Sequence, residues 1–471
     1  MLTSSLVRHA QTALAAASAR IPSPSHPLAQ PPAGSALRMV MGDSGVPYLG
    51  HTLPMLYSTL EWSRDRYERY GSVSWMNFLG IRAIHAVGAD AMADVLFNRD
   101  RSFSNAEAWG YFLNPFFQRG VMLLDFEEHV RHRRILQQAF TRPRLADYLA
   151  VMNVTIDRTI ARWRMTPNFP LYPHVKQLTL NIATEVFIGA GLGSQSSRID
   201  EAFVAAVHAP LAIMRADVPG GAYSRGLRGR KTLETYFREL IPGKRRGNGT
   251  DLLSVLCHAE DDDRRLTDDD VVNHMIFVMM AAHDTSTATM AMMAYFLGKH
   301  PQWQAKARAQ SLALRKSDLD YHDIDQLTVL DAVMKETLRL YPPVAAHWRY
   351  TLQDTQIDGH YIPAHSRVFV NSFGSHRLQN WWPNPDQFDP DRFSDTRRED
   401  KTHRAAWAPF GAGAHKCIGM HFGGMEIKTV MHKLLLKYGW SVDGHRQLPI
   451  KMTTGPIPAD GLPLRIFPLS A

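Results

Sequence analysis

The chain has 471 residues, of which 45% are hydrophobic and 21% charged, proportions that are ordinary for a folded protein. Its 53 basic and 45 acidic side chains give a formal charge of +8, but the basic residues are spread along the chain, which disfavours nucleic-acid binding. With only two cysteines, Cys257 and Cys417, the sequence excludes a disulfide framework and a Cys/His zinc site, and it indicates a reducing compartment.

Residues 1–42 contain three arginines but no Asp or Glu, and an Ala-rich run in them is followed by a Pro- and Ser-rich stretch. Basic, acid-poor segments are typical of organelle-targeting peptides, whereas Pro/Ser-rich segments are typical of disordered linkers. We expect residues 1–42 to form a disordered tail, with a targeting-like segment as the alternative. Residues 43–471 are expected to form a single domain.

The rest of the chain is predicted to be mainly α-helical with a small β portion. Pro47–Tyr70 carries apolar residues at helical spacing, whereas Val73–Met76 and Ala83–Val87 show the brief apolar runs of strands. Helical patterns then dominate to about Leu340. Short β-branched segments follow in Thr351–Val370, and irregular coil, a long helix and an extended end complete the chain.

Two basic residues, His129 and Arg133, lie four positions apart within Asp125–Phe140 and therefore share one face of a predicted helix. Paired cations of this kind can bind buried carboxylates. The alternative is a solvated basic helix face, which is how we interpret the neighbouring Arg131, His132 and Arg134. The latter charges would also suit contact with an acidic electron donor.

The longest apolar stretch, Met275–Gly298, predicts a buried helix and not a membrane span, because the polar residues His283–Thr287 interrupt it. Burying such residues costs free energy unless they are hydrogen-bonded or face a cavity. Asp284 and Thr285 set a carboxylate beside a hydroxyl, a pair that is able to transfer protons. Taken alone, the pattern fits a satisfied polar patch within a helix equally well.

Glu336 and Arg339 lie three positions apart in a predicted helix, Leu327–Leu340, which ends at Pro342-Pro343. An exposed pair of this kind contributes little and is common. The pair is informative because of its position in the sequence. A Pro- and Asp-rich coil follows it, and Cys417 comes about 80 residues later.

The decapeptide Phe410–Gly419 is the most informative segment of the sequence. Its three glycines allow a tight turn and a close approach of the backbone to a flat ligand. A predicted helix follows Cys417, and its positive end, together with His415 and Lys416, favours a thiolate. Without a nearby second cysteine, such a thiolate suits axial ligation of haem iron better than zinc or a disulfide. A buried free cysteine in a glycine-rich turn is the alternative.

This decapeptide resembles the haem-binding signature of the cytochrome P-450 superfamily, and the likeness extends from about Gly42 to the end of the chain. Ala281–Ser286 resembles the family's oxygen-activation motif, although Ala282 stands where the family usually has glycine. The resemblance implies a cytochrome P-450 fold with haem b (iron protoporphyrin IX) between the long central helix and the Cys-loop helix. It also implies a haem-dependent monooxygenase that uses O2.

The resemblance implies roles for individual residues. Cys417 would be the axial ligand of the haem iron, and Asp284 and Thr285 would form the proton relay. Glu336, Arg339 and Arg392 would form a buried structural triad on the proximal side of the haem. The residues expected to contact the haem itself, four of them through its propionates, are Phe410, Gly411, His129, Arg133, Arg349 and His415.

Segments that contact substrate in the family correspond here to stretches that include Trp109–Val121 and Phe203–Tyr236, which are rich in aromatic residues and Met. We therefore expect a medium-to-large apolar substrate such as a sterol, a terpenoid or a fatty acid. Only about 30 residues follow the Cys-loop helix, fewer than a reductase domain needs. Electrons are accordingly expected from a separate ferredoxin or flavodoxin with its reductase.

The sequence contains no transmembrane anchor, and we expect a cytoplasmic, bacterial-type protein, with organelle targeting as the alternative. Two other functions compete with monooxygenation. One is a peroxide-driven haem-thiolate enzyme, which the intact acid–alcohol pair disfavours. The other is a helical binding protein without haem.

Overall fold

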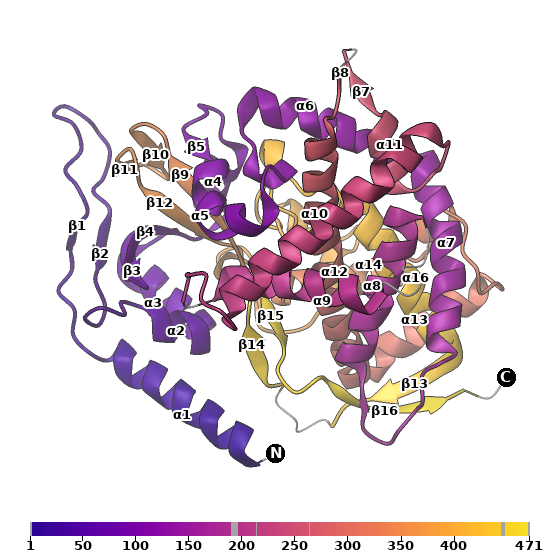
Figure 1. The fold of residues 1–471 in the computed structure, drawn as a ribbon. Coiled ribbons are helices and arrows are strands. Elements are labelled where there is room, and N and C mark those ends of the chain that lie inside the picture. Colours follow the sequence, from indigo (N-terminus) through magenta and orange to yellow (C-terminus); the bar gives the residue numbers. More distant parts are fainter. Residues whose placement is uncertain (1, 190–195, 213, 263, 444–447, 470–471) are drawn as a thin grey trace. The chain divides into compact units, whose positions relative to one another are not determined.

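The computed structural model describes residues 2–189, 196–212, 214–262, 264–443 and 448–469 (Figure 1). The chain divides into two compact units. Unit 1 comprises Met1–Ala108, Leu338–Lys416 and Lys451–Ile457, and unit 2 comprises Trp109–Thr337, Cys417–Ile450 and Pro458–Ala471. Helices dominate and sheets are small, which confirms the predicted fold class.

Unit 1 is built on a seven-stranded sheet with the order β1-β2-β3-β4-β12-β9-β5. β12 pairs with β4 in parallel and with β9 antiparallel, so a strand from late in the chain closes onto the early hairpin β3–β4. β10 and β11 form a separate antiparallel pair. The strands are β1 (His26–Pro27), β2 (Met41–Asp43), β3 (Val73–Phe78), β4 (Ile81–Ala86), β5 (Phe103–Ser104), β9 (Ala346–Thr351), β10 (Thr355–Ile357), β11 (His360–Ile362) and β12 (Arg367–Asn371).

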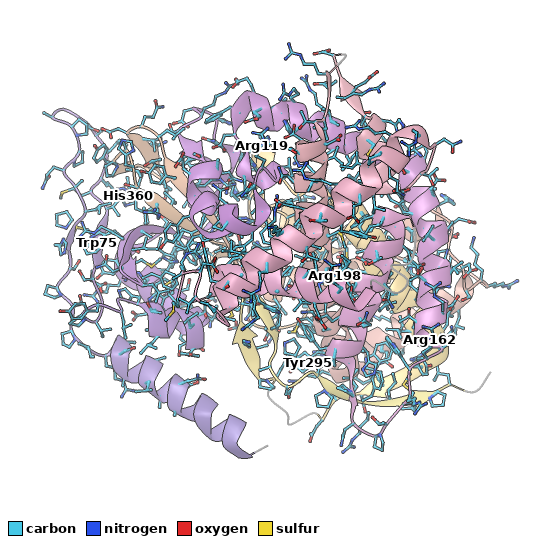
Figure 2. The ribbon with its side chains drawn as sticks, viewed as in Figure 1. Trp75, Arg119, Arg162, Arg198, Tyr295 and His360 are labelled. Atoms are coloured by element: carbon cyan, nitrogen blue, oxygen red, sulfur yellow. The ribbon has the colours of Figure 1, made fainter. Side chains whose placement is uncertain are left out.

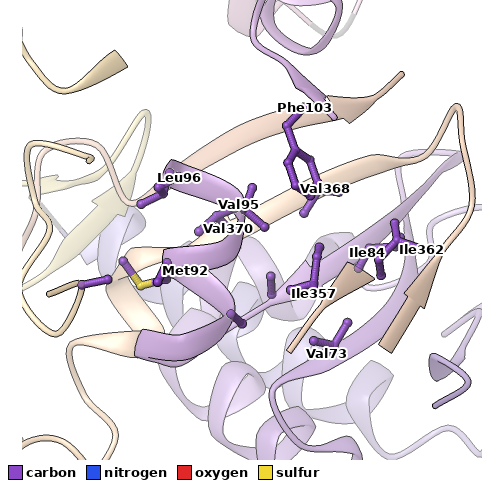
Figure 3. Close-up of a cluster of buried hydrophobic side chains, with 14 of the residues drawn as sticks. Val73, Ile84, Met92, Val95, Leu96, Phe103, Ile357, Ile362, Val368 and Val370 are labelled. Atoms are coloured by element: carbon purple, nitrogen blue, oxygen red, sulfur yellow. The ribbon is translucent and has the colours of Figure 1, made fainter. Parts of the chain in front are cut away.

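The hydrophobic core of unit 1 lies where α4 (Ala89–Phe97) packs on this sheet (Figure 3). Met92, Val95 and Leu96 of the helix belong to one buried cluster with Val368 and other strand residues. The helix ends at Asn98, whose left-handed backbone (φ 47°) stops it. Other helical segments of unit 1 are α1 (Leu2–Ala19), α2 (Thr52–Tyr57), α3 (Thr59–Tyr70), α15 (Ser372–Ser375), η6 (Pro390–Phe393), η7 (Glu399–Lys401) and η8 (Gly413–His415).

The predicted strands at Val73 and Ala83 are confirmed as β3 and β4, but Pro47–Tyr70 is not one helix. α2 and α3 are separated at Ser58, whose backbone (φ −142°, ψ 41°) is not helical. The apolar spacing continues across this break, and for that reason the sequence pattern does not reveal it.

Unit 2 is almost entirely helical. Its helices are α6 (Phe126–Gln137), α7 (Arg142–Ile160), α8 (Leu171–Ile188), α9 (Ser196–His208), α10 (Ala222–Arg246), α11 (Leu252–His258), α12 (Asp268–Lys299), α13 (Pro301–Ala313) and α16 (Met420–Lys437), with η1 (Val121–Leu123), η2 (Gln138–Phe140), η4 (Ala209–Leu211) and η5 (Asp323–Gln326). Two helices, α5 (Ala106–Phe117) and α14 (Thr328–Leu340), begin in one unit and end in the other. The remaining strands are β6 (Phe169–Pro170), β7 (Glu260–Asp261), β8 (Arg264–Arg265), β13 (Tyr438–Ser441), β14 (Ile450–Met452), β15 (Pro456–Pro458) and β16 (Pro463–Pro468).

The long central helix that the sequence predicts is α12, which packs against α8, α10, α13 and α16. Its first turn is stabilised by Thr267, whose hydroxyl accepts a hydrogen bond from the Asp270 amide (3.1 Å), and by three acidic residues. Side chains are buried along most of the helix. Among the described helices, none is long and apolar enough to cross a membrane.

Candidate active site

The glycine-rich loop of the predicted haem signature forms a tight turn in unit 1. Gly411 (φ 68°) and Gly413 (φ 65°) both have left-handed backbones, which favour glycine. A Cβ at Gly413 would lie 2.3 Å from the Leu96 carbonyl oxygen at the end of α4, so the close approach also requires glycine. The conformation of this turn therefore requires glycine at both positions, and the sequence has glycine at each.

In unit 2, Cys417 lies three residues before the first residue of α16 and is exposed, whereas Cys257 is buried. Burial raises the pKa of the Cys257 thiol to about 11. Arg133 of α6 is close enough to Cys417 for their charges to interact, although burial lowers the pKa of Arg133 overall. Cys417 is thus the cysteine with a cation and a helix N-terminus beside it, the surroundings that stabilise a thiolate.

α6 carries the two predicted propionate residues, of which His129 is buried and Arg133 partly buried. The expectation that His132 belongs to a solvated basic face is wrong. His132 is fully buried, and its Nδ1 lies 2.8 Å from Nε2 of His274 on α12. Arg134 is exposed, as expected. This buried histidine pair joins positions 142 residues apart, which no local pattern indicates.

The predicted relay residues lie in a partly exposed stretch in the middle of α12. Met280, Ala281, Ala282, Asp284 and Thr285 are partly exposed, while His283 and the residues on either side of this stretch are buried. The Thr285 hydroxyl donates to the Ala281 carbonyl (2.8 Å). The middle of a helix that is mostly enclosed is thus accessible at a carboxylate and a hydroxyl.

Asp284 contacts a histidine and a lysine of unit 2. Its Oδ1 lies 3.1 Å from His283 Nδ1 and 3.4 Å from Lys176 Nζ of α8. Burial alone would raise the pKa of Asp284, but His283 and Lys176 outweigh it and lower the pKa to about 2. The carboxylate is therefore ionised at neutral pH.

A second buried acid, not predicted from the sequence, lies near this stretch. Glu426 of α16 is buried, and burial raises its pKa to about 8, although a hydrogen bond with Ser286 of α12 lowers it. Its Oε2 has no hydrogen-bond partner among the described residues. Glu426 lies nine positions after Cys417, on a helix whose sequence gives no signal of function at this position. Only its burial in the structure marks it as a candidate.

Glu336, Arg339 and Arg392 are all almost completely buried. Arg339 donates to the carbonyls of His376 (2.8 Å) and Pro385 (2.7 Å) within unit 1. Arg392 donates to the carbonyls of Pro383 (2.6 Å) and Asn384 (2.8 Å), and it forms an ion pair with Glu399 (2.7 Å), an acid that the sequence analysis missed. The two arginines hold the coil before the Cys loop by its main chain.

Unit 1 also holds the other predicted propionate residues. Arg349 of β9 is buried and donates to the Trp348 carbonyl (2.8 Å). Nδ1 of His415 lies 3.0 Å from the Asn105 side-chain nitrogen, and the Phe410 ring packs edge-on against Trp407. Unit 1 thus holds two of the basic residues predicted to contact the propionates, Arg349 buried and His415 partly buried.

The family model described as Cytochrome P450 matches residues 42–461. The chain belongs to the cytochrome P450 family. A relative in Mycobacterium tuberculosis named cytochrome P450 136 is 43% identical over 452 residues, covering 94% of this chain and 92% of the relative. A sterol 14alpha-demethylase of Mycolicibacterium vanbaalenii is 28% identical and covers 79% of this chain and 84% of its own.

Solved P450 structures share the fold. Retinoic acid bound cyanobacterial CYP120A1 superposes with a TM-score of 0.82 at 24% identity, covering 91% of this chain and 99% of its own. The cytochrome P450DA heme domain gives 0.78 at 23% identity, with 87% and 92% covered. These findings confirm the resemblance inferred from the sequence, including its bacterial type, the haem b cofactor and the monooxygenase class.

The residues of this P450 fit a haem. A thiolate at Cys417, in the field of Arg133, would suit axial ligation of iron. Arg119, labelled in Figure 2, donates to Glu128 (2.8 Å) and Asp270 (3.1 Å), and so ties the segment after α5 to α6 and α12 within unit 2.

Proposed function

We propose that this cytochrome P450 hydroxylates a medium-to-large apolar substrate, such as a sterol, a terpenoid or a fatty acid, with electrons from a separate ferredoxin or flavodoxin and its reductase. The observation that carries the proposal is the accessible stretch Met280–Thr285 in the middle of α12. It sets a carboxylate and a hydroxyl beside apolar side chains. Such a combination serves proton delivery next to an apolar substrate.

The bound haem-thiolate supplies dioxygen activation and the transfer of one oxygen atom to a C–H bond. Cys417 is proposed as its axial ligand, because the N-terminal end of α16 and Arg133 both favour the thiolate. Cys257, buried and with a raised pKa, remains a thiol at neutral pH. His129, Arg133, Arg349 and His415 are proposed to hold the propionates, with Phe410 and Gly411 against the ring.

Asp284 and Thr285 are proposed to move protons. With its pKa lowered to about 2, Asp284 is a carboxylate that accepts a proton from water and passes it on, and it does not store one. The Thr285 hydroxyl donates to the Ala281 carbonyl, and turning away from this acceptor would free it to donate on the accessible side of α12. Ala282, the smallest side chain after glycine, leaves that side open.

Apolar side chains of unit 2, the names of two similar proteins and an exposed arginine support the proposed substrate and partner classes. Phe277 and Met280 bring apolar surface to the same part of α12, and Phe116 and Phe117 are buried in unit 2. The relative named sterol 14alpha-demethylase and the neighbour with bound retinoic acid both take apolar skeletons, by their names. Exposed Arg134 on α6 suits an acidic electron donor.

The test is the absorption spectrum of the reduced protein under carbon monoxide. A strongly red-shifted Soret band establishes thiolate ligation, and its loss in Cys417→Ala assigns the ligand. Turnover supported by reduced ferredoxin but not by peroxide would agree with the proposal, whereas the reverse would establish the peroxide-driven alternative. A protein that takes up no haem would leave only a binding function.

A further inference from the structure

Arg215 lies in the segment between η4 and α10, and its guanidinium is held against α5. Its Nη2 donates to the Tyr111 carbonyl (2.7 Å) and its Nη1 to the Pro210 carbonyl (3.2 Å). The guanidinium carbon lies 5.0 Å from the centre of the Tyr111 ring and 5.5 Å from that of Tyr223. Two hydrogen bonds and two cation–π contacts therefore fix the position of this side chain.

The Tyr111 carbonyl is open to Arg215 because of Pro115. In a regular helix this carbonyl would accept from the amide four residues later, but proline has no amide hydrogen. α5 therefore presents a main-chain acceptor at its surface. The position of the arginine follows from a feature built into the sequence of α5.

No carboxylate pairs with Arg215 in the part of the chain that the structure describes, and both of its hydrogen bonds go to neutral carbonyls. Arg225 and Arg228 of α10 likewise donate to the Gly220 carbonyl and the Ser224 hydroxyl, not to acids. Arg215 is partly exposed, so the remaining N–H donors of its guanidinium can bind a carboxylate in a forked geometry.

Exposed apolar side chains adjoin this cation, together with the exposed Asp217 two positions away. Met214 is 67% exposed, Tyr111 48% and Val218 45%. Met is a flexible side chain that adapts to ligands of varied shape. An apolar body with a carboxylate head is the ligand that matches both properties.

We propose that Arg215 recognises the carboxylate of an apolar acid, and that the preferred substrates are long-chain or terpenoid carboxylic acids. The inference rests on the proposed function, because Tyr111, Arg215 and Tyr223 belong to segments that we expect to contact substrate. It narrows the apolar substrate class to acids.

The test measures ligand binding by the spin-state shift of the haem in the holoenzyme. Two matched pairs are used, dodecanoic acid with dodecanol and retinoic acid with retinol. At least one acid is expected to bind about tenfold more tightly than its alcohol, equivalent to about 1.4 kcal/mol. In Arg215→Ala this preference should disappear through loss of acid binding, and Arg215→Lys should retain part of it because it keeps the charge but not the fork.

Arg238→Ala is the control, since it removes the same charge from α10 at an exposed position outside the segments expected to contact substrate, and it should leave the preference unchanged. An unaltered carbon monoxide spectrum shows that each variant is folded and loaded. If Arg215→Ala weakens acid and alcohol equally, Arg215 is only a structural clasp and the inference is wrong. If neither acid is preferred in the parent protein, the inference also fails, while alcohol binding alone would leave the proposed apolar class intact.

Discussion

Two charged side chains within unit 2 meet the cost of burial in different ways. Lys433 of α16 is completely buried, and its ammonium group lies 2.6 Å from Asp157 and 2.5 Å from Asp318. Asp284 of α12 is partly exposed, and its two basic neighbours, His283 and Lys176, lie farther away, at 3.1 and 3.4 Å. One charge is tightly paired and the other loosely paired.

The difference distinguishes a charge that stabilises the fold from one that we propose takes part in proton transfer. A buried lysine with two close carboxylates has no alternative partner, so the contact fixes α16 in place. A carboxylate with longer contacts and access to water can change partners, and proton transfer requires such a change. Loose pairing at Asp284 therefore suits the proposed relay, although it stabilises the fold less than the buried pair at Lys433 does.

The largest effect is expected when the tight pair is broken. In the double variant Asp157→Asn and Asp318→Asn, the buried Lys433 loses both counter-charges, and the free energy of unfolding should fall by about 3 kcal/mol. Chemical denaturation measures this. Asp269→Asn, which breaks an exposed pair with Arg238, is the control and should change the value by less than about 0.5 kcal/mol. An equal loss in both variants would remove the distinction.

Removing the loose charge should also affect turnover. Asp284→Asn keeps the shape of the side chain but cannot carry a proton, so substrate hydroxylation should fall about 100-fold. The free energy of unfolding should fall by about 2 kcal/mol, less than in the double variant, because the pKa of Asp284 is lowered from 3.8 to about 2 in the folded protein. Single-turnover rates and denaturation curves measured on the same preparation test this. A stable variant with unchanged turnover would show that Asp284 has no role in the relay.

Glu426 differs from both of these residues, because its raised pKa makes the stability of the fold depend on pH. Its pKa in the folded protein is raised to about 8 from an ordinary value of 4.5. The folded state therefore keeps a proton that the unfolded state releases, and stability is lost as pH rises from 4.5 towards 8. Glu426→Gln removes this loss, so the melting temperature of the variant should exceed that of the parent at pH 8. At pH 5 the two should nearly coincide, and a constant difference at both values would contradict the explanation.

The smallest effect is expected at Lys176. Lys176→Met removes one cation from Asp284, so the low pKa of that carboxyl should rise and the acidic limb of the pH–rate profile should shift upwards. Turnover at neutral pH should change only a few-fold, because Asp284 stays ionised there. A profile that does not move would mean that Lys176 does not influence the relay.

The Cys loop could be predicted from the sequence because its requirements are local. Glycines at positive φ, a cysteine and a following helix are all visible within one segment, and the structure places them as expected. The existence of the polar stretch on α12 could be predicted for the same reason.

The partners of these residues could not be predicted. Lys176 and Glu426 approach α12 from helices that are distant in sequence, and His132, expected on a solvated face, is instead buried against His274. The two arginines of the predicted triad show another reason why contacts could not be predicted from the sequence. Much of the contact of Arg339 and Arg392 is with main-chain carbonyls, which every residue type offers and no pattern of side chains reveals.

That manner of holding the coil has a consequence for its tolerance of substitution. Because Arg339 and Arg392 donate to main-chain oxygens of Pro383, Asn384 and Pro385, a change of side chain at exposed Asn384 leaves these acceptors in place. Neighbouring Trp382 and Asp386 have no such freedom, since the ring of one is buried against Arg339 and the carboxylate of the other pairs with Arg377.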